Sequence, residues 1–305
     1  MDIDLVYTWV NGNDPAWRQK FTHHKKSDTH QDATAKGRFF DNDELRFSLR
    51  SVEAFAGWVR KIFIVTDHQV PEWLNPNHPK ITVVDHSAII PKRYLPTFNA
   101  NVIEWHLHNI PDLSEYFLLA NDDFFFGRSV APDFFFNEQG TPIAFAKHWR
   151  PQSQDLYGRF IQNTADYAVQ RLDHPLLFLF AHITTPYRKS FIQEVFALFQ
   201  DVLETTLYNR FRSENDLNRL LIEIYDHAKG RRILRFGDRN LLEKITRKYR
   251  AVNLSDNFRF KLQLLKWLRY PLFCVNDTED TTDEARQIAR RFLESYFPDK
   301  SAFEK

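Results

Sequence analysis

Two acidic corners, each at the end of an apolar run, hold the residues of this 305-residue chain best suited to chemistry. Asp122 and Asp123 follow the run Tyr116–Ala120, and Asn276 and Asp277 end a second such run. Paired carboxylates at a strand end can hold Mg²⁺ or Mn²⁺, and such an ion neutralises the charge of a diphosphate. A polar turn after a buried strand would use the same residue types. We therefore treat these four residues as candidate metal ligands.

The segment after the first apolar run has the residue types of a nucleotide-binding loop. Trp9 could stack on a base, and Asn11 and Asp14 could bind sugar hydroxyls. A strand followed by an Asn-Gly turn explains the pattern equally well. The candidate binding residues of this segment are Tyr7, Thr8, Trp9, Asn11, Gly12 and Asp14.

Two predicted helices carry further candidates. Arg46 lies in a helix that a cap at Asp41 or Asn42 would open, and it could reach a phosphate. Pairing with a glutamate on the helix surface is the simpler explanation for that arginine. Glu104 lies beside a tryptophan in a helix predicted over 99–109, where partial desolvation would suit it to proton transfer. A solvated helix face is the alternative for Glu104.

His182 and Arg212 are candidates for contact with phosphate. His182 precedes a helix that we expect to begin at Pro186, and a helix N-terminus favours anions. Arg212 follows that helix, and arginine makes bidentate phosphate contacts. Taken singly, each residue is more often an ordinary surface side chain.

The spacing of apolar residues predicts the elements that must position these side chains. Four short runs rich in Ile, Val and Phe are typical of buried strands in a parallel sheet. These runs are Ile3–Val10, Ile62–Val65, Ile81–Val84 and Tyr116–Ala120. Helical periods lie between some of them, so we predict an α/β fold. Ligands of such folds bind beyond the carboxyl ends of the strands, where the polar residues named above would gather.

The later part of the chain is predicted to be more helical. We divide the chain into an α/β core over 1–150, a mainly helical insertion over 151–260 that carries His182 and Arg212, and a return to the core over 261–305.

Two further helices are indicated by cap signals. One should run from Ser213 to His227. The other should open at the capping box Thr281–Glu284 and end at Tyr296.

Composition excludes several classes of protein. Lys and Arg total 41 against 40 Asp and Glu, a balance that argues against a nucleic-acid binder. An aromatic content of 15% is enough for a large core and excludes a disordered chain. Cys274 is the only cysteine, so neither an intrachain disulfide nor a cysteine-based zinc site is expected. The eight glycines form none of the common phosphate-binding loops.

The overall balance conceals a basic stretch over 231–270, which holds 12 Lys and Arg but only three Asp and Glu. This stretch could contact anionic lipid or a polyanionic glycan, and a solvated helical surface explains it equally well. No apolar run approaches the roughly 20 residues that span a bilayer. We expect a cytoplasmic protein, or one at the inner face of the membrane.

The order of these motifs resembles the Stealth family of sugar-phosphate transferases. That family includes bacterial capsule and exopolysaccharide phosphotransferases and the lysosomal-enzyme N-acetylglucosamine-1-phosphotransferase. Four blocks match in family order: Asp4–Asp14, a long run from Arg38 to Asp123, His182 to Arg212, and Cys274–Asp277.

The resemblance implies a GT-A-like, Rossmann-type α/β fold whose mixed or parallel sheet is flanked by helices. It also implies a UDP-sugar donor, usually a UDP-N-acetylhexosamine, a glycan acceptor, and Mg²⁺ or Mn²⁺. The family transfers sugar-1-phosphate, so UMP would leave. The family's catalytic positions correspond to Glu104, Asp122, Asp123, His182 and Arg212. Asn42, Arg46 and Asn99 complete the candidate nucleotide-sugar-binding residues.

On this resemblance Asp123 would hold the metal, helped by Asp122 or by the corner at Asn276 and Asp277. His182 would act as the general base or contact phosphate.

Arg212 would stabilise charge on the transferring phosphoryl group. Glu104 would orient or deprotonate the acceptor. Two alternatives stay open: a conventional metal-dependent glycosyltransferase that releases UDP, and a non-catalytic module that binds nucleotide-sugar or glycan.

Overall fold

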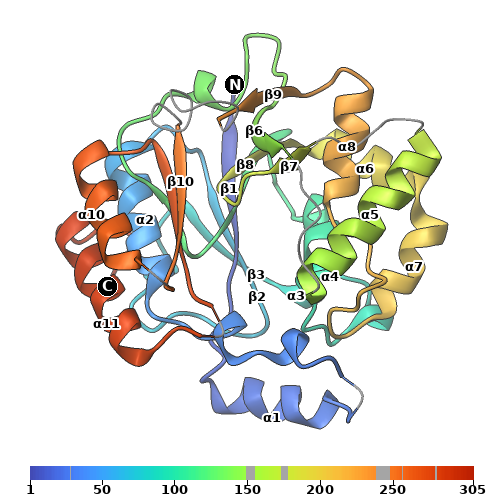
Figure 1. The fold of residues 1–305 in the computed structure, drawn as a ribbon, viewed down its shortest axis with the longest axis horizontal. Helices are drawn as coiled ribbons and strands as arrows, with labels where there is room; N and C mark the ends of the chain where they lie inside the picture. The colour runs from blue at the N-terminus through green and yellow to red at the C-terminus, as the bar shows by residue number, and fades with distance from the viewer. Residues whose placement is uncertain (28, 149–154, 173–177, 238–247, 256, 279) are drawn as a thin grey trace.

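A five-stranded mixed sheet with the order β3-β2-β1-β4-β8 lies at the centre of the molecule (Figure 1). Its strands are β1 (Ile3–Thr8), β2 (Ile62–Thr66), β3 (Ile81–Asp85), β4 (Tyr116–Asn121) and β8 (Thr185–Arg188). β1 to β4 are parallel, whereas β8 runs antiparallel to β4. The four predicted strands are confirmed to within two residues at each end, and the α/β class is confirmed with them.

The computed structural model describes residues 1–27, 29–148, 155–172, 178–237, 248–255, 257–278 and 280–305. Part of the basic stretch, residues 238–247, therefore lies outside the described residues. None of the helices described is long and apolar enough to cross a membrane.

The sheet is buried on both faces because its strands are apolar at successive positions. β1 shows this directly. Leu5 and Tyr7 pack into one core with helix α2 (Glu44–Phe55), whereas Val6 packs into a second core on the opposite face. Alternate side chains of a strand point to opposite faces, so a continuous apolar run serves both cores.

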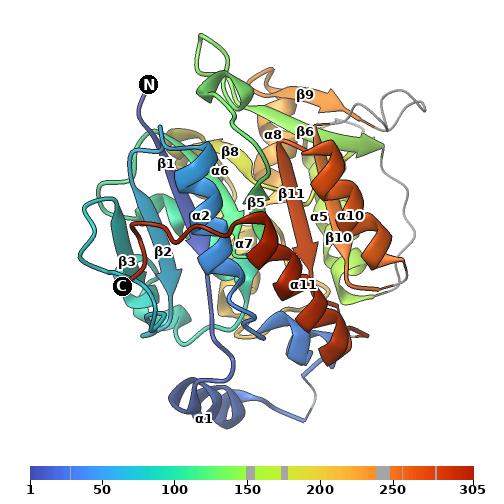
Figure 2. The same cartoon turned by 90° about the vertical axis from the view of Figure 1, so that its left-hand side faces the viewer.

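Helices lie on both sides of the central strands (Figures 1 and 2). On one side are α2 (Glu44–Phe55), α10 (Phe258–Leu268) and α11 (Asp283–Tyr296). On the other side are α3 (His86–Ile89), α4 (Ala100–Trp105), α5 (Leu156–Leu172), α6 (Lys189–Leu198), α7 (Gln200–Tyr208) and α8 (Leu220–Ala228). Helix α1 (Pro15–His24) follows the loop at the carboxyl end of β1.

Two smaller sheets extend the core. One has the order β10-β11-β5 and is formed by β5 (Phe124–Phe126), β10 (Tyr249–Asn253) and β11 (Leu272–Asn276). The other has the order β7-β6-β9 and is formed by β6 (Ile143–His148), β7 (Phe178–Phe180) and β9 (Ile233–Phe236). The segment 151–260 thus contributes strands to all three sheets as well as α5 to α8. The division of the chain at 150 and 260 stays a prediction.

The helix predicted to begin at Pro186 is wrong at its start. Thr185–Arg188 forms β8, and helix α6 begins only at Lys189. β8 is an edge strand of the sheet, with a neighbour on one side only. Proline has no N–H to donate, and such edge strands tolerate it better than central strands do. Thr185, Pro186 and Tyr187 are all buried in this strand.

Three helix boundaries also differ from the prediction. The residue before α2 is Asp43, in the left-handed region at φ 65°, rather than Asp41 or Asn42. The region 99–109 contains α4 followed by a separate 3₁₀ turn over Leu107–Asn109.

Helix α8 starts at Leu220, because the residues after Ser213 form a loop around Asp216. The capping box of the last helix is displaced by one residue, since the hydroxyl of Thr282 accepts from the amide of Ala285. The end of that helix at Tyr296 is confirmed.

Candidate active site

The turn from β4 to β5 brings the two acidic corners together. Asp122 and Asp123 form this turn, and β5 pairs with β11, which ends at Asn276. The thiol of Cys274 in β11 donates to Asp123 Oδ2 at 3.1 Å. The amide of Val275 donates to the carbonyl oxygen of Asp123 at 3.2 Å. The pairing of two strands far apart in sequence therefore builds the acidic corner.

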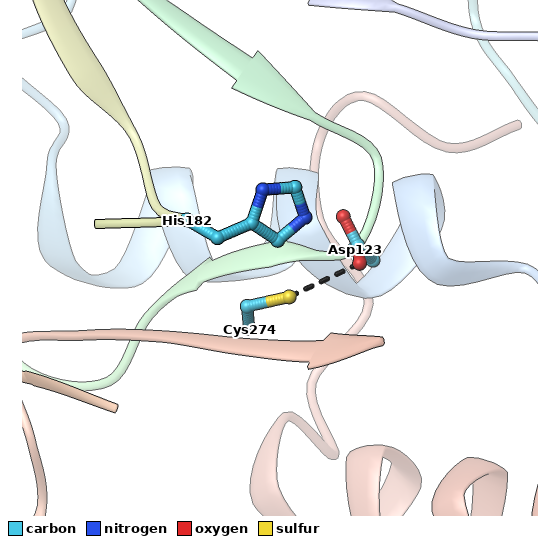
Figure 3. Close-up of side chains that lie close together, drawn as sticks. All are labelled: Asp123, His182 and Cys274. Atoms are coloured by element: carbon cyan, nitrogen blue, oxygen red, sulfur yellow. Dashed lines mark hydrogen bonds between the residues drawn. The ribbon is translucent and has the colours of Figure 1, made fainter. Parts of the chain in front are cut away.

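His182 reaches this corner from the turn between β7 and β8 (Figure 3). One ligand atom each of Asp123, His182 and Cys274 lies within 4.8 Å of the other two. The imidazole packs edge-on against the ring of Phe124, with 4.8 Å between the ring centroids. In the part of the chain that the structure describes, the ring nitrogens of His182 have no hydrogen-bond partner.

Further carboxylates lie close to Asp122, and their charges act on one another. Burial raises the pKa of Glu44 to about 8 and that of Asp41 to about 6. Burial raises the pKa of Asp123 to about 6, even though the Cys274 thiol donates to it. The pKa of Asp122 rises well above its usual value through burial and through the charges of Asp123, Glu44 and Asp41. Such a concentration of carboxylates favours a bound cation.

The second corner is already engaged by protein groups. Arg286 holds Asp277 with two hydrogen bonds, of 2.6 and 3.1 Å. The amide of Asn276 donates to Asn253 Oδ1 at 3.3 Å. Asp122 forms no ion pair or side-chain hydrogen bond with any residue described. Of the three predicted carboxylate ligands, Asp277 is therefore held by an arginine, whereas among the residues described Asp122 and Asp123 are not.

The oxygens at this corner fit a hard divalent cation. Asp123 Oδ1 is inaccessible to solvent and accepts no hydrogen bond from the residues described. A buried carboxylate oxygen without a donor is costly unless something else satisfies it. A divalent metal bound by carboxylate oxygens would do so.

A group of arginines and glutamates faces His182 from α4 and α8. Arg219 lies directly before α8, and its Nε is 3.2 Å from Glu104 Oε2. The same guanidinium donates to Glu223 Oε1 at 2.7 Å and also to the hydroxyl of Tyr187. Burial raises the pKa of Glu104, and the charges of Arg219 and Arg212 oppose that rise. Glu104 is therefore a largely buried carboxylate held in place by a charged partner.

Arg212 differs from Arg219 because its guanidinium has no protein acceptor. It forms no hydrogen bond or ion pair with the residues described, and its guanidinium carbon lies 6.0 Å from the ring centroid of Phe160. Burial, and next the charge of Arg38, lowers its pKa to about 10, so it stays protonated at neutral pH. A half-buried guanidinium without a carboxylate is suited to an anion from outside.

These cations also act on His182. His182 is exposed at the surface, but nearby protein atoms still remove part of the water around its imidazole. This loss of hydration, followed by the charges of Arg219 and Arg212, lowers the pKa of His182 below its usual value. The imidazole is therefore neutral at pH 7 and can accept a proton.

A buried carboxylate fixes the loop that carries Arg212. Asp216 is 0% exposed and accepts four hydrogen bonds of 2.8 to 3.1 Å. The donors are the side-chain amides of Asn99, Asn101 and Asn209 and the backbone amide of Ser213. Since Asn99 also caps α4, this network joins the loop of Arg212 to the helix of Glu104.

Several predicted nucleotide-sugar-binding residues instead have structural partners. The hydroxyl of Tyr7 is buried and shares a 2.7 Å hydrogen bond with Ser48. Asp14 caps α1 by accepting from the amide of Trp17 at 2.7 Å. Arg46 pairs with Glu304, near the C-terminus. Asn99 is buried in the Asp216 network. No direct ligand contact is needed to explain these four residues.

The remaining predicted binding residues lie along the loop after β1 and at the start of α2. Trp9 is buried, and Thr8 ends β1 in a half-buried position. The backbone of Asn11 exchanges two 2.9 Å hydrogen bonds with the side chain of Gln69. A Cβ on Gly12 would lie 2.4 Å from the carbonyl oxygen of Phe39, so only glycine fits there.

Asn42 donates to Glu44 from both its backbone and its side chain. Since the charge of Glu44 acts on Asp122, Asn42 is part of the surroundings of the acidic corner.

Three residues of the site were missed in the sequence. Arg219 looks like half of a surface pair with Glu223 at i,i+4, and nothing in that spacing indicates that it reaches Glu104. Asp216 lies in a polar segment typical of loops. The contact of Cys274 with Asp123 depends on the pairing of β5 with β11, which local periodicity does not reveal.

Three regions of the chain match conserved regions of one protein family. These are "Stealth protein CR1, conserved region 1" over residues 1–20, "Stealth protein CR2, conserved region 2" over 38–144, and "Stealth protein CR4, conserved region 4" over 265–305.

Curated relatives with similar sequences carry related names. An exopolysaccharide phosphotransferase of Streptomyces coelicolor is 36% identical over 99% of this chain. The chain spans about half of that relative, 52% of its length. The capsular polysaccharide phosphotransferase fcs1 of Haemophilus influenzae is 33% identical over 97% of this chain and 84% of its own length. The corresponding protein WcwK of Streptococcus pneumoniae is 32% identical over 99% of this chain and 98% of its own length.

Among solved structures, the galactosyltransferase LgtC in complex with donor and acceptor sugar analogues aligns with 96% of this chain and 95% of its own. The two sequences are 10% identical, and the TM-score is 0.44.

Proposed function

Because this chain belongs to the Stealth family, we propose that it transfers hexose-1-phosphate from a UDP-sugar to a glycan hydroxyl. The transferred group is N-acetylhexosamine-1-phosphate, UMP leaves, and the product is a phosphodiester of capsule or exopolysaccharide. Support for this class of reaction comes from the names of relatives that match over most of the chain, all capsular or exopolysaccharide phosphotransferases.

One observation carries the proposal. One ring nitrogen of His182 lies within 4.8 Å of a carboxylate oxygen of Asp123, and Arg212 is close enough for its charge to lower the pKa of His182. Among the residues described, Asp123 Oδ1 accepts no hydrogen bond and the Arg212 guanidinium has no acceptor. A diphosphate bound to a metal needs oxygen ligands for the ion and cationic donors for the phosphate oxygens. Both kinds of group converge here around a neutral base.

Asp122 and Asp123 would hold Mg²⁺ or Mn²⁺, with Asp277 and Asn276 at the rim. When bound, the ion would neutralise diphosphate charge and stabilise the leaving UMP. Asp123 Oδ1, buried and without a donor in the described structure, is the oxygen that gains most from it.

The proposed chemistry breaks one bond and forms another at a single phosphorus. The acceptor hydroxyl attacks the sugar-proximal phosphorus while the bond from that phosphorus to the bridging oxygen breaks. UMP leaves with the bridging oxygen. His182 takes the hydroxyl proton, because its imidazole is neutral and unpartnered in the described structure.

The remaining side chains position the reactants and stabilise charge. Arg212 would donate to the equatorial phosphoryl oxygens, where charge builds up in the transition state. Glu104 is held by Arg219 and would orient the acceptor hydroxyl toward His182. The end of β1 and the loop after it, from Thr8 to Asp14, would hold the nucleotide. Within that loop Gly12 and Asp14 would act by setting its shape, since their local contacts are structural.

Helix α10, within the basic stretch over 231–270, supplies a second surface, and we assign it to contact with anionic lipid at the inner face of the cytoplasmic membrane. Helix α10 buries Leu262 and Leu265 but leaves Phe260, Trp267 and Leu268 exposed by 61%, 71% and 51%. Its cations are Arg259, Lys261, Lys266 and Arg269. An exposed apolar stripe flanked by cations is typical of helices that lie on anionic membranes.

Product analysis tests the proposed reaction. Purified protein is incubated with Mg²⁺, a glycan acceptor and one UDP-sugar at a time, and the products are examined by phosphorus NMR. A phosphodiester signal is expected with one of the donors, and Asp123→Asn should abolish it. A glycoside without phosphorus would overturn the proposal and support a conventional glycosyltransferase.

A further inference from the structure

We propose that Asp123, His182 and Cys274 form a binding site for Zn²⁺, and that an ion bound there blocks the candidate active site. The binding itself depends only on these three side chains. The block rests on the proposed function, because it assumes that Asp123 and His182 take part in the reaction.

The first argument is the donor set. The three side chains offer one carboxylate oxygen, one imidazole nitrogen and one sulfur (Figure 3). Zn²⁺ accepts all three donor types, whereas Mg²⁺ and Ca²⁺ are bound by oxygen. The single cysteine of the chain argues against a site built from several cysteines, but the fold adds oxygen and nitrogen to the one sulfur.

The second argument is distance. Ligands of a tetrahedral zinc ion lie about 3.5 Å apart, given metal–ligand bonds of about 2.0 to 2.3 Å. The sulfur of Cys274 is already 3.1 Å from Asp123 Oδ2, and all three ligand atoms lie within 4.8 Å of one another. Small rotations of the His182 and Asp123 side chains therefore suffice, and the backbone need not move.

The third argument is that the donor atoms have few competing partners. Among the residues described, the ring nitrogens of His182 have no partner, and Asp123 Oδ1 accepts no hydrogen bond. Within the described part of the chain, the thiol of Cys274 donates to Asp123 and to no other residue. On binding, the thiol proton would pass to solvent, the sulfur would bind the ion as thiolate, and a water molecule would complete the tetrahedron.

A second group, Asp67, His68 and Asp85, provides an internal comparison. Its ligand atoms also lie within 4.8 Å of one another. Here, however, Lys20 pairs with Asp67 at 2.5 Å, and His68 Nδ1 lies 3.0 Å from Asp85 Oδ2. This group has no sulfur, so a metal bound there could not show a thiolate signal.

The experiment uses the purified chain without donor or acceptor. Co²⁺ is titrated as a spectroscopic substitute for Zn²⁺, and Zn²⁺ affinity is then measured by competition with a chromophoric chelator. We expect one thiolate-to-cobalt charge-transfer band at one ion per chain, displaced by Zn²⁺ but not by millimolar Mg²⁺.

Variants locate the ion. Cys274→Ser should remove the charge-transfer band and weaken Zn²⁺ binding by at least about tenfold. His182→Ala should weaken Zn²⁺ binding comparably. Because the His182 side chain is exposed, this variant keeps the fold even if Cys274→Ser does not. His68→Ala is the matched control and should leave the band and the affinity unchanged.

Three results would overturn the site: no thiolate band in the wild type, unchanged zinc affinity in His182→Ala, or loss of binding in His68→Ala. Turnover is assayed separately. If the protein is active with Mg²⁺, stoichiometric Zn²⁺ should stop that activity in the wild type, and whatever activity Cys274→Ser retains should need at least about tenfold more Zn²⁺ for inhibition. A protein that binds Zn²⁺ yet shows no transfer would contradict the proposed reaction and leave the site intact.

Discussion

The loop that presents Arg212 should depend on a carboxylate that touches no substrate. In Asp216→Ala, the amides of Asn99, Asn101 and Asn209 and the Ser213 amide lose their acceptor. Each hydrogen bond contributes about 1 kcal/mol, so the free energy of unfolding should fall by about 4 kcal/mol. For a chain of this size that corresponds to a Tm lower by roughly 10 °C.

The catalytic effect of the same change should exceed its effect on folding. A displacement of Arg212 by about 1 Å should lower kcat by about 100-fold, with little change in the donor KM, because the arginine acts mainly in the transition state. Arg212→Ala should lower kcat by about 1000-fold and leave the Tm almost unchanged, since its guanidinium has no protein acceptor in the described structure.

Thermal unfolding and steady-state kinetics, both well below the Tm, separate these effects. Asn163→Ala is the matched control, because Asn163 donates to the carbonyl oxygen of Asn215 at 2.9 Å without touching the Asp216 carboxylate. This control should lose some stability and keep its kcat. An Asp216→Ala protein that unfolds about 10 °C earlier but turns over at the wild-type rate would refute the positioning role.

Three further predictions concern charge, metal and surface. Burial alone would raise the pKa of Glu304, but hydrogen bonds, first from Arg50, lower it to about 2. Its stabilising effect is therefore present above its unfolded pKa of about 4.3 and is lost as the pH falls toward about 2. Glu304→Gln should lower the free energy of unfolding at pH 7 by about 3 kcal/mol. In urea unfolding measured across pH, the variant should lose less stability than the wild type between about pH 4 and pH 2, and an equal loss would disprove the role of Glu304. EDTA should abolish turnover and Mg²⁺ should restore it, but Asp122→Asn should need more Mg²⁺ for half-maximal rate; an equal requirement would exclude Asp122 as a ligand. Trp267→Glu should abolish sedimentation with anionic vesicles, whereas Tyr208→Glu, at a site 57% exposed on α7, should not; equal sedimentation of both would reject α10 as the contact.

The sequence was sufficient for the parts of the fold that depend on local pattern. The apolar runs predicted β1 to β4, because a strand that is buried on both faces is a continuous apolar run and is therefore easy to find in a sequence. They also placed Asp122 and Asp123 at the end of a strand. A second apolar run that ends in Asn276 and Asp277 indicated a second acidic corner near the same site, and the β5–β11 pairing provides the physical basis for it.

Tertiary partners explain what the sequence did not predict. Pro186 is a helix-start residue by local rules, yet it lies in an edge strand because β4 has a free side there. In the sequence Arg46 looks like a candidate phosphate ligand. In the structure it forms an ion pair with Glu304, which is more than 250 residues away in the chain. Arg219 gave no signal because its partner Glu104 is more than 100 residues away in the chain.

The nucleotide released from a UDP-sugar is the most direct test of the proposed phosphotransfer. Purified protein, Mg²⁺, acceptor and a UDP-N-acetylhexosamine labelled in the uracil ring are incubated, and the labelled products are separated by anion-exchange chromatography. UMP should accumulate in equal amount to the transferred sugar-1-phosphate, and Arg212→Ala should suppress it. Release of UDP in step with sugar transfer would contradict attack at phosphorus.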